Sequence, residues 1–318
     1  LTMVNHSTPE TEFVLHCVIG PEQRTYTIAL LVLIYLVSLI GNLLVILVIQ
    51  MNHRLHSPMY IFISTLALID LANSTTLIPK MVADIQFEAA VVPYGACILQ
   101  MYIVYNLEQM ESLLLAFMAL DRYVAVVYPL RYNSIITKKN VYIVVIVLPV
   151  FAFLVHSPFV VFASELSFCR TNILPYCFCE YATMVQISCN NDPKYLTLLS
   201  MVVIVLGLCP LVLIFLSYTR IVVAALKISS SDGKSKVFST CFTHLLVVGL
   251  FYFPLLTSYI LPGAGVKLSA EAYNTMVIVG NVVPPMLNPV IYSFRNKEIK
   301  NSIFKILRGK RMAPEATE

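Results

Sequence analysis

The chain has 318 residues, of which 58% are hydrophobic and only 12% charged, and its formal net charge at pH 7 is +4. Soluble globular domains carry about 25% charged residues, so this composition and a mean hydropathy of +0.82 exclude that class. The chain is predicted to be a membrane protein with several spans. No Arg-rich segment or small-residue cleavage site precedes the first apolar run, so we expect no removable signal peptide.

Seven apolar stretches are long enough to cross a bilayer, which takes about 20 residues of helix. They lie at 25–49, 57–82, 96–127, 141–163, 195–226, 236–262 and 268–292. We therefore predict an all-α membrane protein with a seven-transmembrane helix bundle. No soluble domain is left over, so 1–318 is expected to be one domain, with an extracellular N-terminus (1–24), the bundle (25–292) and a cytoplasmic helix and tail (293–318).

Positive charge predicts the orientation of the bundle. If the N-terminus lies outside, sixteen of the 21 Lys and Arg residues fall on the inner side. The positive-inside rule therefore places the N-terminus outside and the C-terminus in the cytoplasm. Asn5 then lies outside within Asn5-His6-Ser7, a glycosylation sequon, although such a short triplet is common by chance.

The third span ends at the inner face in Asp121, Arg122 and Tyr123. A carboxylate and a guanidinium side by side at a helix end can neutralise each other. A partner that supplies a better acceptor can then release the Arg. This pairing has the physics of a switch.

Three acidic residues are predicted inside the bilayer. Asp70 lies near the middle of the second span, where a carboxylate costs about 2.5–3.5 kcal/mol on insertion scales. Glu108 and Glu111 share one face of the third span, and Glu111 lies roughly 16 Å above Arg122, level with Asp70. Such a pair fits an aspartyl-protease dyad, a proton or ion carrier, a receptor sodium site, or two protonated acids bonded to neighbours.

Cysteines gather on the predicted outer side, which is oxidising. Cys97 begins the third span, and the loop between the fourth and fifth spans holds Cys169, Cys177, Cys179 and Cys189. The spacings lack a paired C-x₂-C arrangement and this loop has no His, so disulfides are favoured over zinc.

The seventh span contains Pro284, Pro285 and Pro289, which leave several backbone carbonyls without an intrahelical donor. Asn281 and Asn288 are seven residues apart and can face inward to supply donors. The following segment, 294–307, is typical of a short amphipathic basic helix on the inner leaflet, and it has no Cys for a palmitoyl anchor.

Taken together, these motifs resemble the olfactory receptors, a branch of the rhodopsin-like G-protein-coupled receptors. The resemblance covers all seven spans in order. Its motifs are LHxPMYxF at 55–62, MAYDRYVAICxPLRY at 118–132, SYxRI at 217–221, KAFSTCxSH at 236–244 and PxLNPxIYSxRNKE at 285–298. Leu120 replaces the usual Tyr and Val127 the usual Cys. The chain has no Trp and carries Tyr252 in the sixth span, as this family does.

The resemblance implies an odorant receptor of the plasma membrane that activates a stimulatory (olfactory) G protein and raises cAMP. It implies a sodium ion at Asp70 and Glu111 and no other cofactor. It also implies the disulfides Cys97–Cys179 and Cys169–Cys189, which leave Cys177 unpaired; a Cys17–Cys177 bridge stays open and unsupported. The residues that it assigns to coupling and switching are Asp121, Arg122, Tyr123, Tyr218, His244, Asn288, Pro289 and Tyr292.

The resemblance also places a ligand cavity among the outer halves of the third, fifth and sixth spans. The residues expected near it are Val104, Tyr105, Glu108, Gln109, Tyr252 and Tyr259. Tyrosines with one carboxylate suit a small cation, so we hypothesise an amine ligand. Two alternatives are that Lys80, about 10 Å away, neutralises Glu108, or that Glu108 is protonated or shares the ion of Asp70 and Glu111.

Other classes of function find little support. No Ser, His and Asp have the logic of a triad, no Gly-rich phosphate loop is present, and the basic residues border the membrane rather than form a face for nucleic acid. We therefore predict neither an enzyme nor a nucleic-acid-binding protein. An ion channel or transporter that uses the Asp70 and Glu111 acids is the remaining alternative, although no inverted halves are visible.

Overall fold

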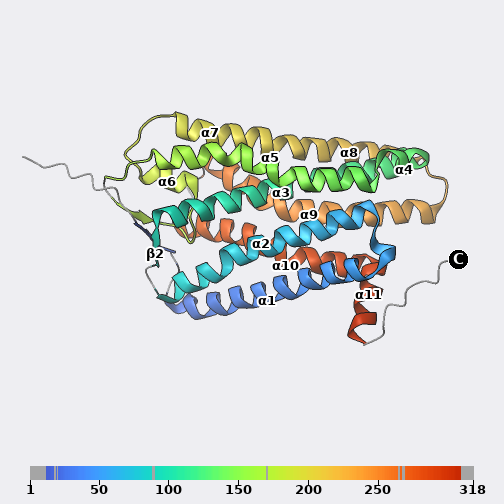
Figure 1. The fold of residues 1–318 in the computed structure, drawn as a ribbon, viewed down its shortest axis with the longest axis horizontal. Helices are drawn as coiled ribbons and strands as arrows, with labels where there is room; N and C mark the ends of the chain where they lie inside the picture. Colours follow the sequence, from blue (N-terminus) through green and yellow to red (C-terminus); the bar gives the residue numbers. More distant parts are fainter. Residues whose placement is uncertain are drawn as a thin grey trace, which may run out of the picture.

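The computed structural model describes residues 12–17, 19, 21–87, 90–169, 171–263, 266 and 269–308. Within these ranges, seven long helical segments lie side by side along one axis (Figure 1). They are α1 (Pro21–Met51), α2 (Pro58–Phe87), α3 (Tyr94–Val127), α5 (Lys138–Ser164), the continuous run of α7 (Lys194–Val202), η3 (Val203–Leu208) and α8 (Cys209–Leu226), α9 (Ser231–Gly263) and α10 (Ala270–Arg295).

The long segments have the length and apolar character of membrane spans. Of the described helices, six qualify individually, and α3 qualifies together with the segment Pro129–Ile135, which bends away from it by 113°. That segment comprises η2 (Pro129–Arg131) and α4 (Tyr132–Ile135). The predicted seven-helix bundle is thus confirmed. The helices extend beyond the apolar stretches at most ends, because a helix continues through polar residues until a cap or a turn ends it.

Short elements close the two ends of the bundle. At one end lie η1 (His53–Leu55) and α11 (Lys297–Leu307), the predicted eighth helix. Asn296 separates α10 from α11, because its side chain accepts hydrogen bonds from the backbone N–H groups of Glu298 and Ile299 and so caps α11. Ile299 is fully buried, and Tyr60 of α2 donates a hydrogen bond to Glu298 at 2.7 Å.

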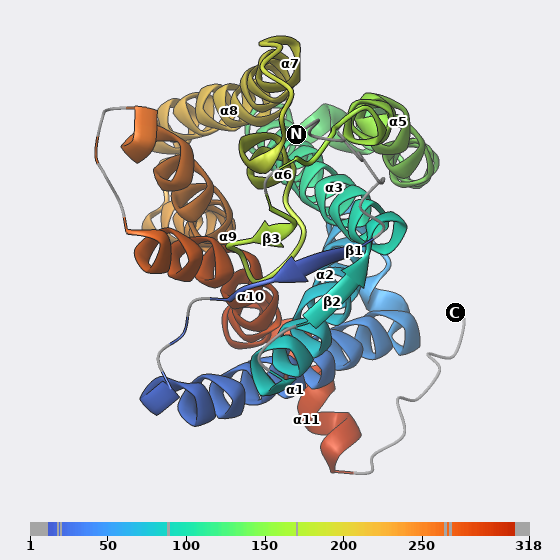
Figure 2. The same cartoon turned by 90° about the vertical axis from the view of Figure 1, so that its left-hand side faces the viewer.

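The opposite end is covered by a small sheet that the sequence did not predict (Figure 2). Its strand order is β2 (Ala90–Pro93), β1 (Glu12–Leu15) and β3 (Ile173–Leu174). Strand β1 is antiparallel to β2, with Phe13 opposite Val92, and parallel to β3. Phe13 is fully buried. Strand β1 is therefore part of the packed structure.

Three disulfides fasten this end, together with α6 (Tyr181–Ile187). The structure contains the Cys97–Cys179 and Cys169–Cys189 bridges that the resemblance implied. It also contains Cys17–Cys177. The sequence left this bridge open, and it forms because β1 carries Cys17 across the end of the bundle to the loop.

Side chains from neighbouring helices satisfy two of the carbonyls that the prolines of α10 leave open. Pro285 cannot donate to the Asn281 carbonyl one turn earlier, and the Asn73 amide does so at 3.2 Å. The Pro285 carbonyl has no backbone donor, because Pro289 one turn later lacks an N–H group. The Asn42 amide donates to it instead, at 2.9 Å. We expected asparagines of α10 itself to do this, but those that bond are on α1 and α2. The prolines thereby join three helices.

The fifth span uses the same device. Its central turn, η3, is π-helical, and Pro210 lies two residues after its end. The Leu206 carbonyl, one α-helical turn before Pro210, accepts hydrogen bonds from Gln109 at 3.3 Å and Ser112 at 3.4 Å. Two side chains of α3 therefore hold the irregular turn in place.

Candidate functional site

A cavity of about 70 Å³ lies between α2, α3, α9, α10 and the loop that precedes α6. The cavity combines acids with aromatic rings. Its acidic lining residues are Glu108, Glu111 and Glu180, and its aromatic ones are Tyr105, Tyr176, Phe178, Phe251 and Tyr273. The disulfide between Cys97 and Cys179 brings the loop over α3, and this places Glu180 at the cavity.

A second cavity of about 70 Å³ lies on the other side of Glu108, towards the fifth span. It shares Tyr105, Glu108, Phe251 and Leu255 with the first. Its remaining lining residues are Gln109, Ser112, His156, Phe159, Leu199, Val202, Val203, Leu206 and Gly207. The π-helical turn of the fifth span therefore forms part of its wall, and such turns are frequent at functional sites.

Four of the six predicted ligand-binding residues line these cavities. Val104 lines the first, Gln109 the second, and Tyr105 and Glu108 line both. Tyr252 is in neither lining, whereas the neighbouring Phe251 is in both. Phe251 and Tyr252 are consecutive in α9, so their side chains point about 100° apart. The side chain of Tyr259 lies outside the described residues.

Tyr252 instead supports the floor of the second cavity. Its hydroxyl forms a 2.8 Å hydrogen bond with the hydroxyl of Ser112, a residue that lines this cavity. The ring is buried against Phe251, with ring centroids 4.9 Å apart. Tyr252 therefore couples α9 to α3 just beneath the lining.

The loop residues of the cavity were missed at the sequence level. Tyr176 and Phe178 flank Cys177, and Glu180 follows Cys179. Their proximity to the bridged cysteines was a usable signal, because a loop tied to the start of the third span must pass over the bundle. Tyr176 and Phe178 contact edge to face, with ring centroids 4.9 Å apart.

Lys80 does not pair with Glu108. Its ammonium group forms an ion pair with Asp84, one turn further along α2. The alternative in which Lys80 neutralises Glu108 is therefore excluded. Glu108 has Asn281 as a side-chain partner and interacts electrostatically with Glu180.

Beneath the cavity, the structure brings Asp70 and Glu111 to the same polar cluster. Asp70 is fully buried, and Asn288 donates hydrogen bonds to its two carboxylate oxygens at 3.1 and 3.3 Å. Asn288 also lies beside Glu111, which interacts electrostatically with Asp70. The described residues contain no group of three or more His, Cys, Asp or Glu side chains that could hold a metal ion.

At the α11 end, the Asp121 carboxylate is held by two partners. Arg122 lies 3.2 Å away, and the Tyr132 hydroxyl donates a 2.7 Å hydrogen bond to it. Tyr123 packs edge to face against Tyr128, with ring centroids 5.8 Å apart. The Asp121 side chain is fully buried, while the Arg122 side chain keeps 22% of its surface exposed.

The same end of α9 is tied to two other helices. The Tyr218 hydroxyl of α8 forms a 2.6 Å hydrogen bond with Nδ1 of His244, which is buried. Arg295 of α10 donates to Ser239 at 3.3 Å and to Thr243 at 3.5 Å. Its guanidinium also lies 5.4 Å from the ring centroid of Phe242. Arg295 was not predicted as a site residue.

Pro289 and Tyr292, two further predicted switch residues, lie between these contacts and the acids. Pro289 packs against Gly41 of α1, and Tyr292 is buried in the core that also holds Tyr218. Asn5, the predicted glycosylation site, lies outside the described residues.

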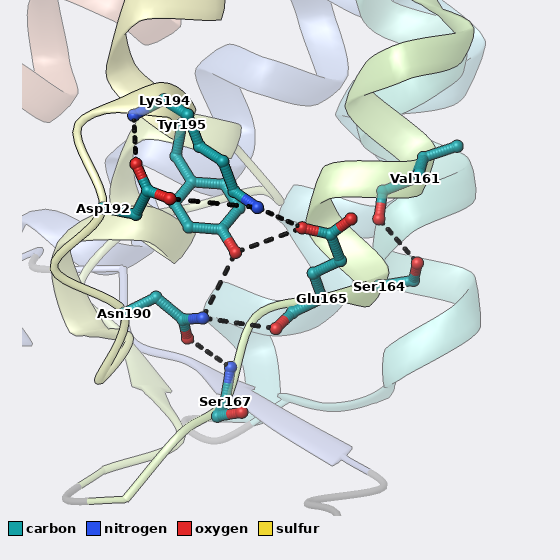
Figure 3. Close-up of polar contacts among 8 residues, drawn as sticks. All are labelled: Val161, Ser164, Glu165, Ser167, Asn190, Asp192, Lys194 and Tyr195. Carbon is teal, nitrogen blue, oxygen red and sulfur yellow. Dashed lines mark hydrogen bonds and ion pairs between the residues drawn. The ribbon is translucent and has the colours of Figure 1, made fainter.

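A polar cluster ties the loop to the fourth and fifth spans at the sheet end (Figure 3). The Lys194 ammonium donates to Glu165 at 2.8 Å and lies 4.9 Å from the ring centroid of Tyr195. The Tyr195 hydroxyl donates to the same carboxylate at 3.3 Å, and Asn190 donates to that hydroxyl at 3.2 Å. This cluster, Glu165–Asn190–Lys194–Tyr195, is called the outer clamp below.

Comparison with known proteins agrees with this seven-helix architecture. A sequence model of the olfactory receptor family matches residues 31–310. The chain is 36% identical to olfactory receptor 1468 of Rattus norvegicus over 92% of its length and 93% of the relative's. It is 37% identical to olfactory receptor 1E2 of Gorilla gorilla gorilla over 91% of each chain, and 34% identical to olfactory receptor 1M1 of Homo sapiens over 91% and 92%.

A bundle of this kind defines a seven-helix membrane protein. The chain belongs to the olfactory receptor family. Membership of a receptor family supports the expectation that the chain is not an enzyme, and none of these comparisons supports a channel or transporter.

Proposed function

We propose that this chain senses odorants as a G-protein-coupled receptor of the plasma membrane. A small odorant binds in the cavity region, and the receptor then activates a stimulatory (olfactory) G protein that raises cAMP. The observation that supports this best is the course of α10. This helix lines the first cavity with Asn281 and Pro285, and its last residue, Arg295, holds the other end of α9. One helix therefore contacts both ends of the signalling path.

The sheet end is proposed to lie outside the cell and α11 at the inner leaflet. Disulfides persist in oxidising surroundings, and all three bridges lie at the sheet end. Arg122, Arg295 and the basic residues of α11 lie at the other end, as the positive-inside rule requires of a cytoplasmic face.

A ligand can act on α9 through the cavity. Phe251 and Leu255 of α9 line both cavities, so a bound ligand contacts this helix. A ligand that packs better when α9 is displaced shifts the equilibrium towards the displaced form. The inner end of α9 then leaves Arg295 and swings outward. A helix of the G-protein α-subunit inserts its apolar face into the groove that opens. Arg122 exchanges Asp121 for an acceptor on the partner.

A sodium ion at Asp70 and Glu111 is part of the proposal. Glu111 Oε1 and Asn288 Oδ1 are buried and have no hydrogen-bond donor among the described residues. Oxygen atoms of this kind are the ligands that hard cations prefer. Asp70, Glu111 and Asn288 would hold the ion, and its charge would reduce the repulsion between the two carboxylates.

The test is a cAMP reporter assay in cells that contain a stimulatory G protein, with an odorant panel and a surface label on the receptor. Arg122→Ala is expected to reach the surface and lose most of the agonist-dependent cAMP, because the partner loses its charged contact. Arg131→Ala, an exposed Arg at the same end of the bundle, is the matched control. Wild-type receptor at the surface that raises no cAMP for any odorant would contradict the proposal.

A further inference from the structure

The first cavity offers hydrogen-bond acceptors in excess. Asn73 lines it and is only 4% exposed, and its Oδ1 has no donor among the described residues. Glu108 of α3 adds a carboxylate to the same lining. The lining contains no Lys or Arg among the residues that the structure describes. A complementary ligand therefore donates hydrogen bonds, and acids without a Lys or Arg in the lining favour one that also carries positive charge.

A second carboxylate is held rigidly above Glu108. Glu180 caps α6, where its Oε2 accepts from the Thr183 N–H and hydroxyl, both at 2.8 Å. Its Oε1 accepts from the Tyr105 hydroxyl at 3.2 Å. Donors on both oxygens fix the position of the Glu180 carboxylate. Glu180 and Glu108 interact electrostatically, so a cation between them relieves a repulsion that the empty arrangement carries.

Aromatic rings complete the surroundings of this pair of acids. Tyr176 contacts both Phe178 and Tyr273, with ring centroids 4.9 and 6.0 Å apart. All three rings line the same cavity as the two carboxylates. Ring faces attract cations and also pack against hydrocarbon, so this shell suits an ammonium group on a short apolar skeleton.

The second cavity gives the apolar part of such a ligand a place. It shares Glu108 and Tyr105 with the first cavity and continues between Phe159, Leu199 and Val203. A ligand anchored at Glu108 can therefore extend its hydrocarbon chain towards the fifth span.

We infer that the ligand of this receptor is a small aliphatic or aromatic amine, bound as its ammonium ion between Glu108 and Glu180. This inference rests on the proposed function, since it names the ligand class of the same site. The ammonium group donates to both carboxylates, and the remaining acceptors of the lining make a neutral or anionic ligand a poorer match.

The experiment compares amines with alcohols and carboxylic acids of the same carbon skeleton in the cAMP assay. Amines are expected to act at concentrations about tenfold or more below those of the matched alcohols, because only the ammonium group forms charge-assisted bonds with the acids. Glu108→Gln and Glu180→Gln keep the size of the side chain while they remove its charge. Each is expected to raise the effective concentration of amines about tenfold or more and to leave that of alcohols within about twofold.

Glu271→Gln is the control, because Glu271 is an exposed acid in the first turn of α10 and lines neither cavity. Surface labelling of every variant separates loss of binding from loss of folding. If neutral odorants raise cAMP and amines act no better, the amine inference is wrong while the proposed function stands. If amine potency is unchanged in both Gln variants, the assigned site is wrong. A surface-delivered wild type that answers no ligand contradicts the inference and the proposed function together.

Discussion

Gly41 of α1 lies directly against Pro289 of α10. A Cβ atom on Gly41 would come within 2.9 Å of Cγ and 3.1 Å of Cβ of that proline. The two helices can approach this closely because Gly has no side chain, and the approach brings Asn42 to the Pro285 carbonyl. Two consecutive residues of α1 therefore contact α10: Gly41 packs against Pro289, and Asn42 donates to the carbonyl of Pro285 that Pro289 leaves without a backbone donor.

Gly41→Ala is therefore expected to destabilise the receptor. The added methyl group meets a rigid proline ring, and such overpacking costs about 1–3 kcal/mol. The measurement is the thermal unfolding of purified receptor, together with its surface level in cells. Gly249→Ala is the matched control, because a Cβ at Gly249 in α9 meets nothing within 4 Å. Equal stability of the two variants would show that α1 and α10 can separate without cost.

Arg295→Ala is expected to raise the cAMP level without agonist. The substitution removes the bonds to Ser239 and Thr243 that hold α9 near α10. A loss of about 1–2 kcal/mol would shift the equilibrium between closed and open forms about 5–30-fold. Basal cAMP is measured at matched surface levels of the receptor. Arg308→Ala, which changes the residue that follows the last turn of α11, is the control. Basal activity at or below that of the wild type would show that the bonds from Arg295 to Ser239 and Thr243 do not hold the receptor in its inactive form.

The outer clamp is expected to make stability depend on pH. The hydrogen bond from Lys194 holds the pKa of Glu165 below its ordinary value of 4.5. A lowered pKa in the folded state stabilises the receptor above the unfolded pKa, and this contribution is lost as the pH falls through the folded pKa. Wild type should therefore be the more stable protein at pH 7 when compared with Glu165→Gln, and the difference should shrink below about pH 4.5.

Thermal unfolding at a series of pH values measures this difference, and Glu22→Gln in the first turn of α1 serves as the control. Because Glu165 is exposed, added salt should weaken the effect. A Glu165→Gln variant with the wild-type pH profile would show that the clamp adds nothing to stability.

Non-reducing peptide mapping is expected to recover three linked pairs, including Cys17–Cys177. Cys17→Ser and Cys177→Ser should each lower stability by about 2–5 kcal/mol and reduce surface delivery. Cys209→Ser, which changes an exposed free thiol in α8, should do neither. Recovery of Cys17 as a free thiol from folded receptor would contradict the structure of the sheet end.

The helical part of the fold could be predicted from the sequence because each span must satisfy its own backbone within the bilayer. Runs of apolar residues therefore mark the spans whatever their neighbours are. Asp70, Glu108 and Arg122 stood out for the same reason, since a charged residue in such a run is costly and needs a partner. Their partners were harder to name, because Asn288 reaches Asp70 only through the packing of helices far apart in the sequence. The same holds for Asn42 and Asn73, which reach backbone carbonyls of α10.

The small sheet and the loop contacts could not be predicted in this way. Strand β1 has four residues and pairs with strands about 80 and 160 positions further along, so no local pattern reveals it. The choice between Phe251 and Tyr252 depended on the rotation of α9, which an apolar stretch with broad hydrophobic cover does not fix. Arg295 looked like an ordinary juxtamembrane basic residue, and only the position of Ser239 shows its role.

The π-helical turn Val203–Leu208 divides the fifth span into two halves whose faces are set separately. One residue more or less in such a turn rotates everything on one side by about 100° relative to the other. Loss of a residue here would turn Leu199 and Val202 away from the second cavity and bring new side chains into it, while Tyr218 kept its bond to His244. A change of length at this turn would therefore be a single mutation that alters the lining of the second cavity and leaves the contact between the inner ends of α8 and α9 in place.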